Sequence, residues 1–364
     1  MSESTTQIDP NQLKAYSFLL FSKLDGAVTS AMVHLGHELG LYGCLATARE
    51  PLTTDDLARA AGLHERWVRE WAHNQVAAKL IAWTDGDEGG RYSLSPEAAA
   101  VLADPNHPAF GMGMFARLPD TMAQMRHLPD SFRTGLGYDY DSHGPNGAAG
   151  IEASFAPWYK NFLVPVALPA LDGVVEKLEA GARVADIGCG GGLAVALMAA
   201  RFPNSQFHGF DISEYALARA RTRQDDLGLV NAQFFDPRER PITADASYDL
   251  ITTFDCIHDM THPHLMLQTI RQAIKPDGTW LLVDIKGRET FAENVAKNPM
   301  AALMYGISVM SCMSSGMSEP GGEGFGTLGL PASKAESMAR EAGFSQFQKL
   351  AIEHSTNSFF EIRV

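Results

Sequence analysis

The sequence predicts an α/β protein in which a mostly helical N-terminal domain precedes a parallel sheet with helices on both faces. The 364 residues are too many for one ordinary core and suggest two domains. From about residue 182 onward, strand-like and helix-like segments alternate, which is typical of a parallel sheet. The first of these strands ends in an acidic residue and a cluster of glycines, which is typical of a turn that cradles a nucleotide.

The composition indicates a globular protein without a membrane anchor. Apolar residues make up 45% and charged residues 20%, and no apolar run approaches the about 20 residues that span a bilayer. The polar start lacks a basic segment followed by an apolar stretch, so no secretory signal is expected. The four cysteines show neither metal-ligand spacing nor a disulfide framework, so we expect a cytoplasmic protein with no metal. The net charge of −14 disfavours both nucleic acid and a membrane surface as partners.

The N-terminal part has the order helix, turn, helix, hairpin, which is a winged-helix pattern. Residues 1–12 are expected to be a loose tail. After Pro51, either Thr53 or Thr54 is the expected N-cap of a helix that ends at Gly62. The predicted helices cover 12–24, 27–41, the segment after Pro51 and 65–79, and the predicted hairpin strands cover 80–83 and 91–94.

A winged helix often binds DNA through its second helix. Here that helix offers Arg66, Arg69 and Lys79 but also Glu65 and Glu70, so it is not strongly basic. The charge pattern therefore favours a scaffold or dimerisation role over DNA binding.

The remaining chain divides into a connector and an alternating region. The connector, residues 95–150, contains a helix-like piece at 109–128 and a loop-rich stretch at 135–147 that marks the expected domain border. Helices broken near Pro165 and Pro169 follow over 153–178. The predicted strands are 183–187, 206–211, 232–235, 248–254, 279–285, 345–353 and 357–363, with helices near 192–202, 213–226, 263–275 and 333–342. The last two strands follow each other directly and should be antiparallel neighbours.

The stretch from Val184 to Gly192 and the acid Asp211 at the end of the next strand carry the strongest functional signal. A dinucleotide fold is one interpretation, but Leu193 stands where its fingerprint needs Gly or Ala. Asp186 would also repel a bound pyrophosphate. A ligand with a cationic amine and a sulfonium suits Asp186 better, and Asp211 can accept hydrogen bonds from ribose hydroxyls.

The segment Asp186-Ile-Gly-Cys-Gly-Gly-Gly192, together with Asp211, resembles the cofactor signature of class I S-adenosylmethionine-dependent methyltransferases. The segments 35–42, 252–259 and 321–324 resemble those of a bacterial subgroup with an N-terminal winged-helix domain. That subgroup is similar in plan to small-molecule O-methyltransferases.

This resemblance implies a Rossmann-like, seven-stranded methyltransferase sheet that ends in an antiparallel hairpin. It implies S-adenosyl-L-methionine as cofactor, a small-molecule substrate and a homodimer in which the N-terminal domain packs on a partner subunit. On this basis, residues 1–150 are expected to form the winged-helix and dimerisation domain with its connector. Residues 151–364 are expected to form the catalytic domain.

The expected cofactor site follows from the same motifs. The glycines of the turn should pass close to the methionine part of the cofactor, Asp186 should hold its ammonium, and Asp211 should hold the ribose. The adenine contact stays open, because Arg238 falls where relatives carry an acid and Asp236 lies two residues early. The cofactor-binding candidates are Asp186, Gly188, Cys189, Gly190, Gly192, Asp211, Ile212, Phe235, Asp236, Phe254 and Asp255; Cys189 is most simply a small packing residue.

His258 is the candidate general base. Methyl transfer to a hydroxyl requires alignment of the acceptor and removal of its proton, and a neutral histidine can take that proton. Asp259 could orient His258 or cap the following helix. The position resembles the His of the His-Asp-Trp segment of O-methyltransferases, with Met260 in place of Trp. A substrate contact without proton transfer and a structural role remain alternatives, and His262 and His264 are expected to be solvated.

The long segment between residues 286 and 331 is the expected acceptor site. It is rich in methionine, which suits either a bulky apolar acceptor or an ordinary core. Its glycines could allow closure over the site, and Asp284 and Lys286 could also face it. The substrate-binding candidates are Met304, Tyr305, Met313 and Glu323.

The predicted function is methyl transfer to a small, partly apolar acceptor, with a hydroxyl oxygen as the preferred target. One alternative moves the methyl group to nitrogen or carbon, with His258 orienting the acceptor. A different class of alternative is a DNA-binding regulator that uses S-adenosylmethionine only as an effector.

Overall fold

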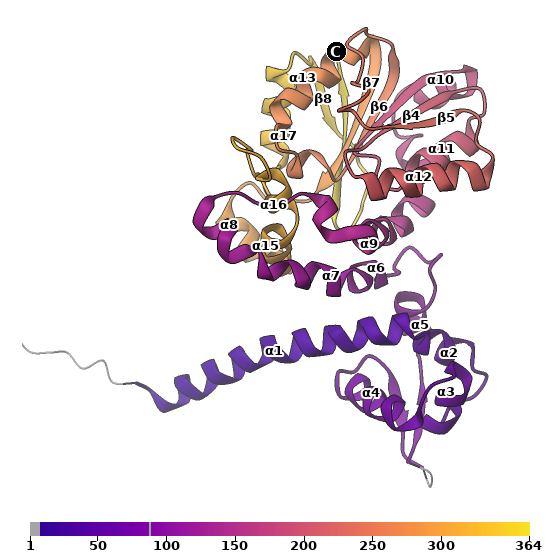
Figure 1. The fold of residues 1–364 in the computed structure, drawn as a ribbon, viewed down its shortest axis with the longest axis vertical. Coiled ribbons are helices and arrows are strands. Elements are labelled where there is room, and N and C mark those ends of the chain that lie inside the picture. The colour runs from indigo at the N-terminus through magenta and orange to yellow at the C-terminus, as the bar shows by residue number, and fades with distance from the viewer. Residues whose placement is uncertain (1–7, 87–88) are drawn as a thin grey trace, which may run out of the picture. The chain divides into compact units, whose positions relative to one another are not determined.

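A computed structural model describes residues 8–86 and 89–364, which divide into two compact units at Leu118 and Pro119 (Figure 1). The sequence places the domain border at 150/151, whereas residues 119–150 pack with the second unit. Hydrogen bonds explain this packing, since the Tyr138 hydroxyl donates to the Met310 carbonyl at 2.5 Å and the Gly137 amide donates to the Met317 carbonyl at 2.9 Å. No helix among the described residues is long and apolar enough to cross a membrane.

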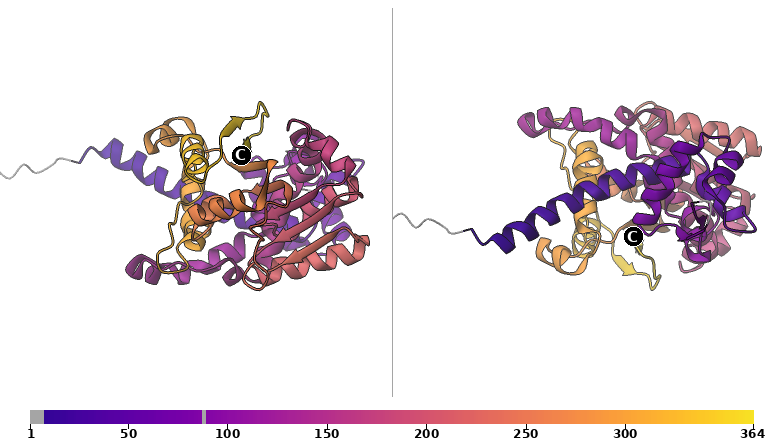
Figure 2. Two further views of the ribbon diagram at one scale, coloured as in Figure 1. Left: turned by 90° about the horizontal axis from the view of Figure 1, so that it is seen from above. Right: turned by 90° about the horizontal axis from the view of Figure 1, so that it is seen from below.

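The first unit begins with one long helix, α1, over Pro10–Glu38 (Figure 2). The sequence predicts two helices here, 12–24 and 27–41, so the expected break near residue 25 is wrong. Gly26 lies inside the helix at a cost of about 1 kcal/mol relative to Ala, which is too small to interrupt it. The Asp9 side chain caps the N-terminus, and Gly40, with φ of 70°, ends this run at the start of the next helix.

The rest of the first unit is a winged helix, as predicted. Thr53 is the N-cap of α3, and Gly62, with φ of 67°, ends that helix. The Tyr42 hydroxyl donates to Gln75 at 2.6 Å within the core that joins these helices. The elements are α2 (Leu41–Thr47), α3 (Thr54–Ala61), α4 (Glu65–Ala77), the antiparallel pair β1 (Ala82–Thr84) and β2 (Arg91–Ser93), α5 (Pro96–Leu102) and α6 (Met112–Ala116).

The second unit is built on a seven-stranded sheet of order β5-β4-β3-β6-β7-β9-β8 (Figure 1). The first five strands in this order are parallel, and β9 is antiparallel to both β7 and β8. The predicted terminal hairpin is therefore confirmed. The strands are β3 (Arg183–Ile187), β4 (Gln206–Phe210), β5 (Ala232–Phe235), β6 (Tyr248–Phe254), β7 (Ile274–Ile285), β8 (Gln346–Lys349) and β9 (Asn357–Arg363).

Helices cover both faces of this sheet, and each face has its own apolar core. One core contains residues of α10 and α11, and the other contains residues of α13 and α17. The helices are α7 (Leu118–Ala123), η1 (Gln124–Arg126), α8 (Leu128–Thr134), η2 (Tyr140–His143), α9 (Gly144–Trp158), η3 (Tyr159–Ala167), α10 (Val174–Ala180), α11 (Leu193–Arg201), α12 (Glu214–Leu227), η4 (Ile257–Asp259), α13 (Pro263–Ala273), α14 (Phe291–Lys297), α15 (Ala301–Met310), α16 (Cys312–Gly316) and α17 (Ala332–Glu341).

Two predicted helical segments differ in detail. The piece expected at 109–128 is divided among α6, α7 and η1. The helices expected over 153–178 begin earlier, at Gly144, and continue as a π-helix through Pro165. Because proline has no N–H to donate, a widened turn can accommodate it where a regular α-helical turn would lose a hydrogen bond.

Candidate active site

Four acidic residues lie where neighbouring parallel strands end. Asp186 and Asp284 are the penultimate residues of β3 and β7, while Asp211 and Asp255 directly follow β4 and β6. The carboxyl ends of parallel strands meet at one edge of a sheet, which is where open α/β sheets bind ligands. This edge therefore gathers residues that are up to about a hundred positions apart in sequence.

The turn after β3 requires glycine. Gly188, Gly190 and Gly192 have φ of 71°, 54° and 71°, a region that side chains with a Cβ rarely adopt. A Cβ on Gly188 would lie 2.7 Å from Cys256, and one on Gly192 would lie 2.7 Å from Phe234. A Cβ on Gly190 would meet nothing within 4 Å, so at this position the backbone is open to a ligand.

Asp186 has a buried oxygen available for a cation. Its Oδ1 accepts a hydrogen bond from Thr252 at 2.7 Å, while its buried Oδ2 has no partner among the described residues. Burial raises the pKa of this carboxyl to about 7. A buried, unpaired carboxylate oxygen is costly in the free protein and suits a ligand's ammonium group.

Asp211 holds the glycine turn in place. Its Oδ2 accepts from the Gly190 amide at 2.7 Å and its Oδ1 accepts from the Ser213 amide at 2.9 Å. Burial raises the pKa of Asp211. The N-cap of α12 is Ser213 rather than Asp211, since the Ser213 side chain accepts from the Ala216 amide. Each Asp211 oxygen keeps a further lone pair for ligand hydroxyls.

His258 lies in the η4 turn after β6 and is paired with Asp284. Its Nδ1 lies 2.6 Å from Asp284 Oδ1, and both side chains are 2% exposed. Burial disfavours the charged ring, but the Asp284 carboxylate and then Cys312 outweigh it and raise the pKa of His258. The other carboxylate oxygen, Asp284 Oδ2, is buried without a partner among the described residues. The sequence predicts for Asp284 only a position that could face the site.

Asp259 has neither of the two roles expected for it. It accepts a hydrogen bond from the Tyr140 hydroxyl at 2.5 Å, whereas Asp284 orients His258. The N-cap position of α13 is His262. Burial raises the pKa of Asp259 to about 6. These pairings depend on the tertiary structure, because Tyr140 belongs to the connector and Asp284 to a different strand.

Asp255 has a strained backbone at the end of β6. It is one of the non-glycine residues with positive φ, at 52°, and such strain is often found at functional sites. Asn357 donates to its Oδ1 at 2.5 Å, and its buried Oδ2 has no partner among the described residues. Burial and the neighbouring Asp284 raise the pKa of Asp255.

An aromatic wall lies beside these acids, and of its three rings the sequence indicated only Phe254. The ring of Phe254 is 5.2 Å from that of Trp158 and 5.5 Å from that of Tyr159. Burial, with the charges of Asp186 and Asp255, raises the pKa of the Tyr159 phenol. Trp158 and Tyr159 join the end of α9 to the start of η3, and only the fold brings them to the sheet edge.

The turn has a second unexpected neighbour in Glu152 of α9. The Arg223 guanidinium donates to Glu152 Oε2 at 2.7 Å and also to the Gly191 carbonyl. The glycine turn is thus supported from outside by an ion pair. Cys189, inside the turn, is buried and faces Gly209, as expected for a small packing residue.

The segment after β5 is organised by Arg238. This guanidinium pairs with Asp236 at 2.6 Å and donates to the Ile212 carbonyl at 2.6 Å. The Asp236 carboxylate is therefore already paired with the guanidinium of Arg238 in the same loop. Phe235 packs against Arg240, whose guanidinium lies 4.0 Å from the ring centroid, and Ile212 remains 46% exposed.

The four acceptor-site candidates lie on α15, α16 and the glycine-rich loop that follows. Met304 and Tyr305 are half-buried on α15, and Tyr305 packs against Phe291. A Cβ on Gly324 would lie 3.7 Å from Met313, and one on Gly326 would lie 3.5 Å from it. Glu323 contacts His264 at 2.6 Å, and the amide of Gly326 donates to the His258 carbonyl. The loop is thereby attached to the segment that carries His258. The half-exposed His262 lies 3.7 Å from Glu319, so the two histidines face separate acids.

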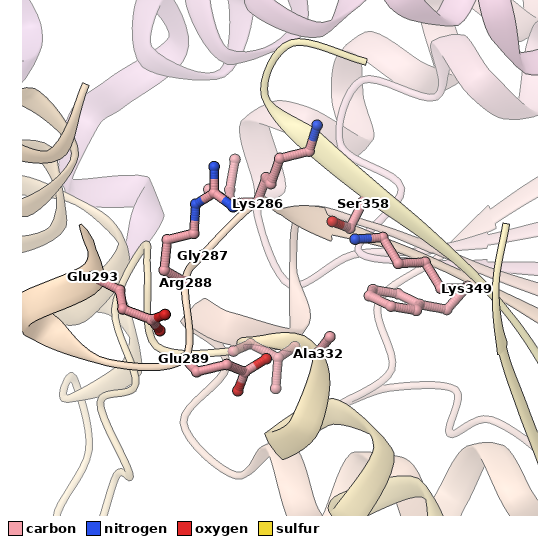
Figure 3. Close-up of a pocket in the computed structure, with 11 residues that line it drawn as sticks. Lys286, Gly287, Arg288, Glu289, Glu293, Ala332, Lys349 and Ser358 are labelled. Carbon is pink, nitrogen blue, oxygen red and sulfur yellow. The ribbon is translucent and has the colours of Figure 1, made fainter. Parts of the chain in front are cut away.

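Lys286 does not join the acidic cluster. Its Nζ donates to the His354 carbonyl at 2.6 Å, and the residue lines a separate cavity of about 200 Å³ with Arg288, Lys349 and Ser358 (Figure 3).

Two family models match the chain. Residues 185–280 match a methyltransferase domain, and residues 27–104 match an Rv2258c-like winged helix-turn-helix domain. Among curated proteins, a ubiquinone biosynthesis O-methyltransferase from Leptothrix cholodnii is 27% identical over 155 residues, which are 42% of this chain and 60% of that protein. The match thus spans less than two thirds of the relative.

Solved structures resemble almost the whole chain. Human N-acetylserotonin methyltransferase in complex with S-adenosylmethionine has a TM-score of 0.69 at 18% identity, covering 100% of this chain and 99% of that one. A mitomycin 7-O-methyltransferase has a TM-score of 0.68 at 18% identity, covering 98% and 99%. At these identities the likeness establishes the fold. With the two family models, it identifies a winged-helix domain followed by a methyltransferase domain.

Proposed function

We propose that this protein transfers the methyl group of S-adenosylmethionine to a hydroxyl oxygen of a small, partly apolar molecule. The observation that carries the proposal is the buried pair of His258 and Asp284 at the carboxyl edge of the sheet, beside the acids that suit the cofactor. A hydroxyl acceptor needs a base at this place, and a histidine held by a carboxylate is a suitable one.

The residues present fit the cofactor. The unpaired Asp186 Oδ2 suits its ammonium, the open backbone at Gly190 permits close approach, and Asp211 keeps lone pairs for the ribose hydroxyls. When bound, the cofactor supplies an activated methyl group on a sulfonium. Ile212, which is exposed, and Phe235, which is half-buried, are the proposed neighbours of the adenine, because Asp236 is already paired with Arg238.

The protein's part in the reaction is to align the acceptor and take its proton. With Nδ1–H donated to Asp284, the other ring nitrogen, Nε2, can accept the proton of an acceptor hydroxyl. Asp284 then stabilises the charged ring and raises the pKa of His258. The difference between that pKa and the pKa of a phenol, about 10, becomes smaller, which makes the proton transfer less unfavourable. Burial excludes water and strengthens both interactions.

The decisive test compares His258→Gln with the wild type. We expect the variant to bind S-adenosylhomocysteine with unchanged affinity in calorimetry, because the ring contacts the acceptor rather than the cofactor. Methyl transfer to responsive members of a panel of phenols and hydroxynaphthoic acids should slow by about 10²–10⁴-fold. A slowing of less than tenfold would remove the base role and favour transfer to nitrogen or carbon, with His258 as an orienting residue.

The DNA-binding alternative receives little support from α4. Arg66 is paired with Glu70 and Arg69 with Glu65, each at 2.6 Å, so these cations are largely neutralised on their own helix. Duplex DNA binding that weakens steeply with salt would revive that alternative.

We also propose a homodimer formed through α1, and a cytoplasmic location. Leu13, Tyr16, Leu20 and Leu24 follow i, i+3, i+4 spacing along α1 and are 55–71% exposed. Such a surface is typical of a helix that packs on a partner. The four cysteines are all free thiols, which is consistent with a reducing compartment.

A further inference from the structure

Three different metal-binding side chains converge beside the proposed base. His258, Asp259 and Cys312 each place one ligand atom within 4.8 Å of the other two. All three side chains are buried. His258 and Asp259 come from η4 and Cys312 from the start of α16, so the cluster exists only in the folded protein and has no spacing signature in the sequence.

The surroundings hold two of these ligands in a suitable form. Because Asp284 faces Nδ1 of His258 at 2.6 Å, Nε2 is the nitrogen left with a lone pair. The Tyr140 hydroxyl donates to Asp259 Oδ2 at 2.5 Å and leaves Oδ1 free of that bond. A carboxylate behind a histidine, and a hydrogen bond behind a ligating carboxylate, are the usual outer contacts of metal sites.

The cluster also has carboxyl oxygens that the fold leaves unsatisfied. Asp255 and Asp284 interact with His258 electrostatically, and each has a buried Oδ2 without a partner among the described residues. Of the buried groups here, only His258 can become a cation. Buried, unpaired carboxylate oxygens are expensive in free energy, and a nearby cation would reduce that cost.

We propose that His258 Nε2, Cys312 Sγ and one oxygen of Asp259 bind a single thiophilic divalent cation, with Zn²⁺ as the expected ion. A sulfur–nitrogen–oxygen set suits Zn²⁺, which takes these ligands at about 2.0–2.3 Å, whereas Mg²⁺ and Ca²⁺ prefer oxygen alone. On binding, the Cys312 thiol and the charged form of the His258 ring each release a proton to solvent, so that sulfur ligates as the thiolate and His258 as the neutral ring. Three protein ligands leave a fourth position open.

The ion would regulate the site as an inhibitor. A metal on Nε2 occupies the lone pair that takes the acceptor's proton, so metal binding and base catalysis exclude each other. This consequence rests on the proposed function, whereas the metal binding itself does not. Methyl transfer should therefore fall as Zn²⁺ fills the site and recover with a chelator.

Co²⁺ is the probe for the site, because a cobalt–thiolate bond gives a charge-transfer absorption that other ligands do not. Metal-free, full-length protein titrated with Co²⁺ should develop this absorption with one equivalent, and Zn²⁺ should abolish it. Cys312→Ser should lack the absorption, while Cys44→Ser, which alters a cysteine of the other unit, should keep it. Asp284→Asn should weaken the affinity by about 10–100-fold, as loss of an outer partner does.

The metal site and the proposed function can fail independently, and different measurements show which of them has failed. Absence of the charge-transfer band in folded wild-type protein, or its persistence in Cys312→Ser, overturns the metal site. If Cys312→Ser is unfolded by circular dichroism, His258→Gln provides the same test, and undiminished Co²⁺ affinity there also overturns it. S-adenosylhomocysteine binding by the wild type and the methyl-transfer rate of His258→Gln are measured in parallel. A failure of the proposed function appears as absent binding or as a slowing of less than tenfold, and either leaves the metal result standing.

Discussion

At the scale of single residues, the site is defined by carboxylates that the fold buries without satisfying completely. Asp186, Asp255 and Asp284 each keep one buried oxygen without a partner among the described residues. Such groups oppose folding and persist where a ligand uses them. At these positions, a substitution that removes the carboxylate should stabilise the free protein but weaken the binding of a cationic ligand.

Asp186→Asn should stabilise the ligand-free protein in a pH-dependent way. The pKa of Asp186 is raised to about 7 in the folded state, against about 3.9 in an unfolded chain. The folded state thus binds the proton more tightly, and the free-energy cost of ionising Asp186 appears as the pH rises above about 4 and is complete above about 7. Urea unfolding should show the variant to be more stable by up to about 4 kcal/mol near pH 8 and nearly unchanged near pH 4.

The same variant should bind S-adenosylmethionine more weakly, since the amide no longer attracts an ammonium. Asp277→Asn, at an exposed acid of the same unit paired with Lys177, serves as the control and should change neither property appreciably. A stability difference that is the same at both pH values would contradict the raised pKa.

At the scale of elements, the turn between β3 and α11 is fixed by hydrogen bonds to the end of β4. The amides of Gly188 and Cys189 donate to the Phe210 carbonyl at 2.8 and 3.0 Å, which ties the turn to the end of β4. The Asp211 carboxylate holds the Gly190 amide from the same direction. The turn is therefore preformed. Within it, Gly190 has open space where a Cβ would stand, whereas Gly192 is crowded by side chains.

Gly190→Ala and Gly192→Ala should separate backbone strain from crowding. Both glycines have positive φ, which costs a residue with a Cβ about 1–2 kcal/mol. At Gly190 nothing lies within 4 Å of the added Cβ, so the loss of stability should stay near that value. At Gly192 the Cβ would lie 2.7 Å from Phe234 and 2.8 Å from Ala220, which adds about 1–3 kcal/mol.

Denaturant unfolding of the two variants checks this ordering, and equal losses would contradict the preformed turn. Calorimetry should show that Gly190→Ala binds the cofactor more weakly, even though its loss of stability is small. The added methyl group would occupy the space in which the cofactor is proposed to approach the backbone.

At the scale of the whole molecule, each unit contributes a different property. In the second unit, residues 119–150 supply Tyr140 to the site and connect to α15 and α16 through Tyr138 and Gly137. In the first unit, α1 presents apolar side chains that its own unit leaves exposed. The site is therefore completed within one unit, while the other carries the surface proposed for dimerisation.

Leu20→Glu should convert the proposed dimer to a monomer. A charge in the middle of the apolar stripe would have to be buried without a partner in the interface, at a cost of several kcal/mol. Ala60→Glu, which places the same charge at an exposed position of α3, is the control and should leave the assembly unchanged. Light scattering after gel filtration measures both; a wild-type protein that is already monomeric contradicts the dimer.

The sequence alone determined the features that depend on local pattern. The alternation of segments predicted the sheet and its terminal hairpin, and caps such as Thr53 and Gly62 predicted helix ends. Glycine at positions 188, 190 and 192 permits the positive φ of the turn, and the acids Asp186 and Asp211 predict which edge of the sheet is the proposed cofactor site. These signals are readable because each lies within a few residues of the structure it specifies.

Only the tertiary structure decided which side chains meet. Asp284 rather than Asp259 orients His258, Tyr140 takes Asp259 instead, and Cys312 completes the cluster. These residues come from a strand, a connector and a helix that are far apart in the chain, and no spacing encodes their proximity. The continuity of α1 has a local reason instead, since the low cost of Gly26 does not interrupt the helix-forming residues on either side of it.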